Sequence, residues 1–137
     1  MREILFRGKR IDNREWAEGY LYGIGEKRYI LYELPNSAPT IGIEVDPETV
    51  CQYTGLTDKN GKKIWEGDVL EAHLDELYPE NITRERIMWD QSGFTTSEAV
   101  LEEKDYLDDF DLEHFEVIGN MFDNPNLMEE YWNGEIN

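Results

Sequence analysis

The chain has 137 residues and a formal net charge of −18, from 31 Asp and Glu against 13 Lys and Arg. Hydrophobic residues make up 39% of it and aromatic residues 12%, which is too much apolar material for a disordered acidic tail and enough for the core of one ordinary domain. Its single cysteine and two histidines cannot form an internal disulfide or the usual zinc sites, so we expect a folded protein without a cofactor.

The beginning of the chain predicts a β-hairpin. Residues 4–10 and 15–23 are expected strands, joined by a turn at "DNR". In the second strand, Trp16, Tyr20 and Tyr22 lie on one face and the small Ala17 and Gly19 on the other. Such a row of aromatic side chains belongs either to a core or to an exposed surface that stacks on nucleic-acid bases. We expect a core position, because the basic groove that nucleic acid would need is missing.

Three further strands are expected before the middle of the chain. Residues 28–34 and 41–45 alternate apolar and polar positions, and the proline-bearing loop at 35–39 separates them. The alternation resumes at 49–53. The next stretch, "QYTGLTDKNGKKIWEGDVL", contains Asn60-Gly61, a strong hairpin signal because both positions tolerate positive φ. Gly67 then permits a bend before a strand that begins near residue 69, so the expected role of this stretch is conformational.

The remainder of the chain mixes strands and helices. Residues 83–89 are an expected strand, and "DQSG" turns the chain toward Phe94. The spacing of residues 100–112 predicts a helix, and residues 116–119 a last strand. A short C-terminal helix follows, with Asn124 as its N-cap and Pro125 as its first residue.

Taken together, these elements predict a mainly β fold, α+β at most. We expect antiparallel hairpins packed on an SH3-like roll or partly open barrel, with a short C-terminal helix. The expected divisions are an N-terminal β-hairpin region at 1–50, an SH3-like roll with an acidic insert at 51–128, and a tail at 129–137 that continues the final helix.

The acidic charge is unevenly distributed. Residues 1–67 hold 10 Lys and Arg and 11 Asp and Glu, a net charge of −1, whereas residues 68–137 hold 3 and 20, a net of −17. Such a field repels nucleic-acid phosphates and anionic membranes and attracts basic partners. The ordinary role of an acidic run is a solvated face that aids solubility, and the alternative is a binding surface. The candidate partner-binding residues are Glu102, Glu103, Asp105, Asp108, Asp109 and Asp111.

Motifs for catalysis or cofactor binding fail on inspection. Gly23 and Gly25 lack the third glycine and the helix of a dinucleotide loop, and "NGKKI" lacks the parts of a phosphate loop. A calcium loop beginning at Asp109 would have His114 where it needs glycine and Asn120 where it needs glutamate. Nothing in the sequence favours a nucleophilic pair of Cys51 with either histidine. We therefore identify no catalytic, cofactor-binding or metal-binding residues.

Three blocks of the sequence stand out, "MREILFRGKRID", "IGIEVDPETVCQYTGLTDKNGKKIWEGDVL" and "FEVIGNMFDNPNLMEE". Together they resemble the YopX family of phage and prophage proteins, in the family's order and over nearly the whole chain. The resemblance implies a β-rich protein whose later part is similar to an SH3-type roll, encoded by a bacteriophage or prophage. It implies no established activity and no known site residues.

Two hypotheses for function remain. The first is a non-enzymatic interaction or assembly module, in its specific form an acidic decoy whose carboxylates imitate a phosphate backbone and occupy a basic partner. The alternative is a small hydrolase that uses carboxylates and a divalent metal, motivated by acid density alone. Without a secretion signal or an apolar stretch of membrane-spanning length, we expect a location in the bacterial cytoplasm. Open sheet edges also allow homo-oligomers, whereas the acidic half would oppose contact on its own face.

Overall fold

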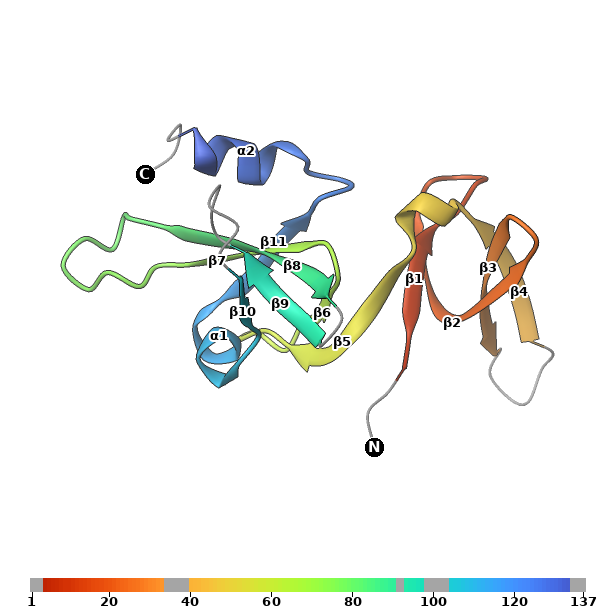
Figure 1. Cartoon of the computed structure of the whole chain (residues 1–137), viewed down its shortest axis with the longest axis horizontal. Coiled ribbons are helices and arrows are strands. Elements are labelled where there is room, and N and C mark those ends of the chain that lie inside the picture. Colours follow the sequence, from red (N-terminus) through yellow and green to blue (C-terminus); the bar gives the residue numbers. More distant parts are fainter. Residues whose placement is uncertain (1–3, 34–39, 91–92, 98–103, 134–137) are drawn as a thin grey trace. The chain divides into compact units, whose positions relative to one another are not determined.

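The described residues of the computed structural model are 4–33, 40–90, 93–97 and 104–133 (Figure 1). They form a mainly β protein with antiparallel sheets and a short C-terminal helix, as predicted. The chain divides into two compact units, Met1–Gly55 and Leu56–Asn137, which are described separately below. Among the described residues, neither α-helix has the length and apolar composition that crossing a membrane requires.

The first unit is built from consecutive antiparallel strands, and the N-terminal hairpin and the strands after it are confirmed. The sheet order is β4-β3-β2-β1-β5-β6, in which β1 pairs with both β2 and β5. The elements of this unit are β1 (Phe6–Lys9), β2 (Trp16–Ile24), β3 (Lys27–Glu33), β4 (Thr40–Val45), the 3-10 helix η1 (Pro47–Thr49) and β5 (Cys51–Thr57). The neighbour of β5 in the sheet order is β6 (Lys63–Trp65).

The core of the first unit lies on the face of the sheet that carries small and aliphatic residues. Ala17, Ile30 and Val45 are buried together, with Phe6 and Val50 packed against them. Alternation along β2 therefore places its large side chains on the opposite face. A Cβ atom at Gly19 would lie 3.1 Å from Ile30 Cγ2, so this face of β2 has no room for a bulky side chain at that position.

The expectation that the aromatic row of β2 lies in the core is wrong. Tyr20 is 60% exposed and Tyr22 is 49% exposed. Trp16 is half-buried, and the guanidinium carbon of Arg7 lies 4.3 Å from the centroid of its ring, the geometry of a cation–π contact. The outer face of this sheet thus presents aromatic side chains with cations beside the first of them.

Gly19 shows how tightly the strands of the first unit approach. A Cβ atom at Gly19 would collide with the backbone carbonyl oxygen of Leu31, which cannot rotate away. A Cβ at Gly42, also a strand glycine, would meet only the flexible end of the Leu31 side chain. We therefore expect Gly19→Ala to lower the free energy of unfolding by about 1–3 kcal/mol, the usual cost of overpacking, and Gly42→Ala by less. Urea titration followed at the amide NMR signals of residues 6–53 measures the free energy of unfolding of each variant. Equal values for the two variants would contradict the close approach of the Leu31 carbonyl to Gly19.

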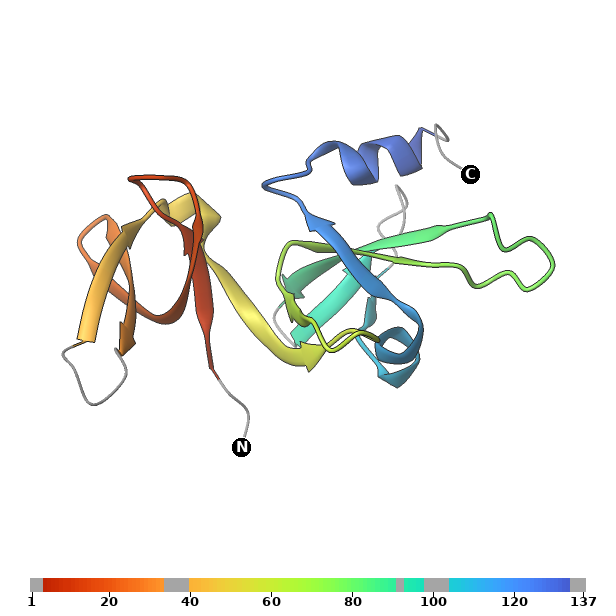
Figure 2. The ribbon, with the colours of Figure 1, turned by 180° about the vertical axis from the view of Figure 1, so that it is seen from behind.

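The second unit contains a five-stranded antiparallel sheet in the order β10-β9-β8-β7-β11. Its core gathers Ile64, Leu70, Ala72, Ile87, Phe94 and Phe115. In Figure 2, which shows the ribbon from behind, β11 follows directly after α1. The elements are β6 (Lys63–Trp65), β7 (Asp68–Ala72), β8 (Thr83–Asp90), β9 (Gly93–Ser97), β10 (Lys104–Tyr106), α1 (Asp109–His114), β11 (Glu116–Asn120) and α2 (Asn126–Trp132).

Two helix predictions need correction. Residues 104–106 of the helix expected at 100–112 form β10, which pairs with β9, and the helix begins only at Asp109; residues 100–103 lie outside the described residues. The second helix has Pro125, not Asn124, at its N-cap position. The side-chain oxygen of Asn124 instead accepts a hydrogen bond from the Asn120 backbone nitrogen at 3.3 Å, in the turn that precedes the helix.

The Asn-Gly hairpin forms as predicted, and buried carboxylates hold it in place. Asp58 Oδ1 accepts hydrogen bonds from the backbone nitrogens of Asn60 and Lys62, at 2.8 and 2.9 Å, and Asp58 Oδ2 accepts one from the Val117 nitrogen at 2.8 Å. Asp68 accepts one from the Trp65 nitrogen at 2.8 Å. Asp58 and Asp68 are buried, and their carboxylates bond backbone groups that would otherwise lack partners. The acids of this motif therefore have structural roles.

Arg84 attaches α2 to the sheet of the second unit. Its Nε donates to Glu71 Oε1 on the neighbouring strand at 3.0 Å, and its Nη1 donates to the Leu127 carbonyl at 2.9 Å. Nη1 also lies 3.8 Å from a carboxylate oxygen of Glu130. Figure 1 shows α2 beside β8, the strand that carries Arg84. One buried guanidinium thus links β7, β8 and α2.

Candidate functional site

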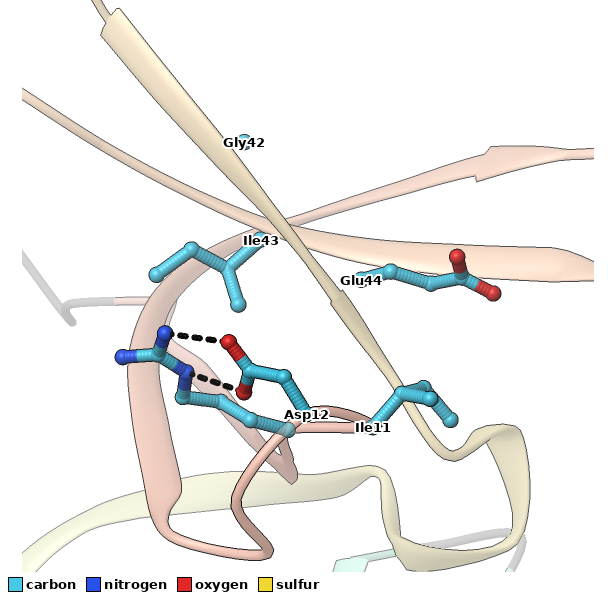
Figure 3. A pocket seen from close by; sticks show the side chains of 6 residues that line it. Ile11, Asp12, Gly42, Ile43 and Glu44 are labelled. Carbon is cyan, nitrogen blue, oxygen red and sulfur yellow. Dashed lines mark hydrogen bonds and ion pairs between the residues drawn. The ribbon is translucent and has the colours of Figure 1, made fainter.

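Two adjoining hollows in the first unit share Arg10 and Ile43. The first has a volume of about 330 Å³ and lies between the outer strand β4 and the turn after β1 (Figure 3). The second, of about 290 Å³, is lined by Trp16 and Tyr32 in addition to the two shared residues. Volumes near 300 Å³ are at the lower end of those found for ligand pockets. The first hollow is lined by Arg10, Ile11, Asp12, Gly42, Ile43 and Glu44.

A two-point ion pair fixes the orientation of Arg10. Its Nε donates to Asp12 Oδ1 at 2.9 Å and its Nη2 donates to Asp12 Oδ2 at 2.7 Å. The side-chain hydrogen bonds raise the pKa of Arg10 and lower the pKa of Asp12, and the attraction between the two charges acts in the same directions. Because the pKa of Asp12 is lowered, the pair is complete above the ordinary pKa of an aspartate and is lost as the pH falls through the lowered value.

Asp12 leaves one edge of the guanidinium available. Within the described part of the chain, no acceptor bonds to Arg10 Nη1. An arginine that is held along its Nε–Nη2 edge can still donate from Nη1 to a carbonyl or carboxylate. The hollow therefore contains an oriented donor with capacity for a ligand.

The backbone beside this hollow has the pattern of an incomplete strand pair. Arg10 and Val45 form an antiparallel bridge. The Ile11 nitrogen donates to the Glu44 carbonyl at 3.1 Å, and the Asp46 nitrogen donates to the Lys9 carbonyl at 2.8 Å. The chain then turns away at Asp12. Pairing on the outer edge of β4 consequently stops before it reaches Gly42.

The acidic residues singled out by the sequence have different structural roles. Asp108 and Asp111 form a capping box at the start of α1, in which each side chain accepts from the other's backbone nitrogen at 3.1 Å, and Asp111 is 7% exposed. Asp109 is exposed on the same helix. Asp105 stands opposite Thr96 in the pairing of β10 with β9. Glu102 and Glu103 lie outside the described residues.

The aromatic residue of α1 lies among the exposed acids. Phe110 is 49% exposed, and its ring stacks on His114 with 4.2 Å between the centroids. Asp109 and Glu113 are exposed, and neither takes part in the capping box. Sequence reasoning had placed Glu113 in the acidic run but had not listed it, or Phe110, among the candidate partner-binding residues. The three side chains Asp109, Phe110 and Glu113 are called the α1 surface below.

The groups considered for nucleophilic or metal chemistry have local partners. Cys51 is buried, and its Sγ donates to the Thr49 carbonyl at 3.2 Å. Nδ1 of His73 lies 2.7 Å from the Pro79 carbonyl, and Nδ1 of His114 lies 2.9 Å from the Phe110 carbonyl. Among the described residues, no three His, Cys, Asp or Glu side chains gather in a group that could hold a metal ion.

Comparison with known proteins identifies the family. The family model described as YopX protein matches residues 5–129. The chain belongs to the YopX family. A crystal structure of protein EF1440 from Enterococcus faecalis is similar to this YopX chain, with 22% sequence identity and a TM-score of 0.55. The likeness covers 93% of this chain and 99% of that one, and at this identity it is a likeness of fold. A search of curated proteins found no match.

Both candidate surfaces fall inside the region that the YopX model matches. Arg10, Asp12 and Gly42 lie near the beginning of residues 5–129, and the α1 surface lies near their end. The structural carboxylates Asp58 and Asp68 lie between them. Neither the hollow nor the α1 surface is therefore an extension appended to the YopX region.

Proposed function

We propose that this YopX-family protein is a non-enzymatic interaction module of phage or prophage origin, which binds a basic protein in the bacterial cytoplasm. The binding surface is on the second unit and includes Asp109 and Glu113. In the specific form of this proposal the protein is an acidic decoy: its carboxylates imitate a phosphate backbone and occupy the nucleic-acid-binding surface of its partner.

The observation that carries this proposal is the division of charge between the two units. Residues 56–137 hold 22 Asp and Glu against 6 Lys and Arg, a net charge of −16, while residues 1–55 hold 9 and 7, a net of −2. Among the cations of the second unit, Arg84 pairs with Glu71, and Arg86 lies over the Trp132 ring. Such a field increases the association rate of a positively charged partner.

The α1 surface combines the two features that a docking contact requires. Its carboxylates supply charge complementarity to a basic protein, and the exposed ring of Phe110 supplies apolar area that a pocket on the partner can bury. The stacked His114 reduces the freedom of that ring before binding. A preorganised aromatic side chain flanked by acids favours a protein partner over a small ligand.

Reversing the charge of the α1 surface tests the proposal. We expect Asp109→Lys combined with Glu113→Lys to reduce capture of the partner from a lysate of the bacterial host at least about tenfold, because two attractive contacts become repulsive. Asp108 and Asp111 are left unchanged, since their substitution would remove the cap of α1. Quantitative mass spectrometry of the captured proteins measures the change.

A matched variant controls for total charge. Glu26 and Glu48 are exposed in the first unit, so Glu26→Lys with Glu48→Lys changes the net charge by the same amount at a different place. We expect this variant to retain most of the capture. An equal loss of captured partner in both variants would show that capture depends on total charge alone. Undiminished capture by the Asp109→Lys and Glu113→Lys variant would show that the α1 surface does not bind the partner.

A further inference from the structure

The outer strand of the first unit is only partly paired on its open side. β4 stands at the end of the sheet order, and its inner side pairs with β3 through six residues. On its outer side the Arg10–Ile11 segment covers the C-terminal end through Val45 and Glu44. In antiparallel pairing, alternate residues direct their backbone N–H and C=O groups outward, so Gly42 is the next residue after Glu44 to do so.

Gly42 offers an open donor and an open acceptor. Within the described residues, no hydrogen bond satisfies its outward N–H or C=O. The residue is exposed, and the hollow of about 330 Å³ lies directly beside it. An extended peptide placed here would continue the pairing that ends at Ile11.

We propose that the β4 edge at Gly42 binds an extended, basic segment of the partner protein as an added strand. The basic charge of this segment rests on the proposed function. The open hydrogen-bonding groups of the edge are independent of it. Strand addition provides affinity through main-chain hydrogen bonds and specificity through the side chains that alternate along the peptide. Gly42 would donate to and accept from the peptide backbone.

The side chains around the hollow favour a basic segment. Figure 3 shows the side chains of Ile43 and Glu44 on opposite sides of β4, with Asp12 on the side of Ile43. Asp12 offsets the charge of Arg10, and within the described residues the Glu44 carboxylate has no cation bonded to it. A lysine of the added strand can reach Glu44 across the pair, and Arg10 Nη1 can donate to a peptide carbonyl.

Synthetic peptides and two substitutions of Gly42 test this inference. The probes are an acetylated and amidated peptide of alternating Lys and Val, seven residues long, and a matched peptide with Glu in place of each Lys. Titration into the ¹⁵N-labelled full chain is expected to shift the amide signals of Gly42, Ile43 and Ile11 with the Lys peptide. The Glu peptide should bind at least about tenfold more weakly.

Gly42→Pro removes the outward N–H without removing a bond to β3, and Gly42→Ala adds a Cβ at the same place but keeps the N–H. We expect Pro to weaken binding of the Lys peptide about tenfold and Ala to leave it nearly unchanged. Equal affinities for the two variants would overturn the inference.

The remaining outcomes separate this inference from the proposed function. Shifts confined to residues 56–133 would overturn the β4 site and leave the acidic second unit as the binding surface. Shifts at β4, together with undiminished capture by the Asp109→Lys and Glu113→Lys variant, would overturn the proposed function but support the site. Sedimentation that shows a dimer of wild type and a monomer of Gly42→Pro would mean that a second copy occupies the edge, against the proposal.

Discussion

Replacing Asp58 with Ala is expected to lower the free energy of unfolding of the second unit by about 3–5 kcal/mol. The Asp58 carboxylate accepts three backbone hydrogen bonds, from Asn60, Lys62 and Val117, and the residue is 6% exposed. Hydrogen bonds to a charged acceptor contribute about 1.5–3 kcal/mol each, and the three are not additive because they share one side chain. Loss of the carboxylate would also remove the bond from the Val117 nitrogen, which is one of the links between the hairpin and β11.

Urea titration followed at the amide NMR signals of residues 56–133 measures this change. Asp75 is the matched control, because its Oδ1 accepts from the backbone nitrogens of Leu77 and Tyr78 in an exposed loop. Water can replace those hydrogen bonds, so Asp75→Ala is expected to lower the free energy of unfolding by less than about 1 kcal/mol. An equal loss of unfolding free energy in the Asp58 and Asp75 variants would show that the buried carboxylate does not stabilise the hairpin.

Replacing Arg84 with Ala is expected to lower the free energy of unfolding of the second unit by about 3–5 kcal/mol and to release α2 from the sheet. The guanidinium is buried against Glu71 and the Leu127 carbonyl, and removing one partner of a buried ion pair leaves an uncompensated charge. Hydrogen exchange should therefore become faster at the amides of α2 than at those of β9. Urea titration gives the accompanying loss of stability.

An exposed ion pair provides the comparison for Arg84. Arg14 Nη1 lies 3.1 Å from Asp46 Oδ2 on the surface of the first unit. Surface pairs of this kind contribute about 0–1 kcal/mol, so Arg14→Ala should have a small effect. Unchanged exchange at α2 in the Arg84 variant would mean that apolar packing, including buried Met128, holds this helix without the guanidinium.

The hairpins could be predicted from sequence because their signals are local. Alternation in β2 and β4 and the Asn60-Gly61 turn each lie within a few residues. β10 was missed because pairing with β9 decides its conformation, and an acidic segment carries little strand propensity of its own. The outward position of Tyr20 was missed because it depends on which face of β2 meets Ile30 and Val45.

The candidate surfaces were predictable to different degrees. Charge counting located Asp109, while the spacing of Asp108 and Asp111, which matches a capping box, could have indicated their structural role. Arg10 and Gly42 are 32 positions apart and meet only through the order of the strands, so no local pattern connects them. The predicted SH3-like roll, the predicted domain limits and the predicted homo-oligomer remain predictions.

The most direct test of a charge-based interaction module is the salt dependence of binding to the purified partner. The partner is first identified by affinity capture from host lysates, with and without prophage induction, and its Kd is then measured from 50 to 500 mM salt. The proposal predicts that wild type loses affinity steeply as salt rises, and that the Asp109→Lys and Glu113→Lys variant binds weakly with a shallower dependence. Affinity that is independent of salt, or equal for wild type and variant at every salt concentration, would contradict it.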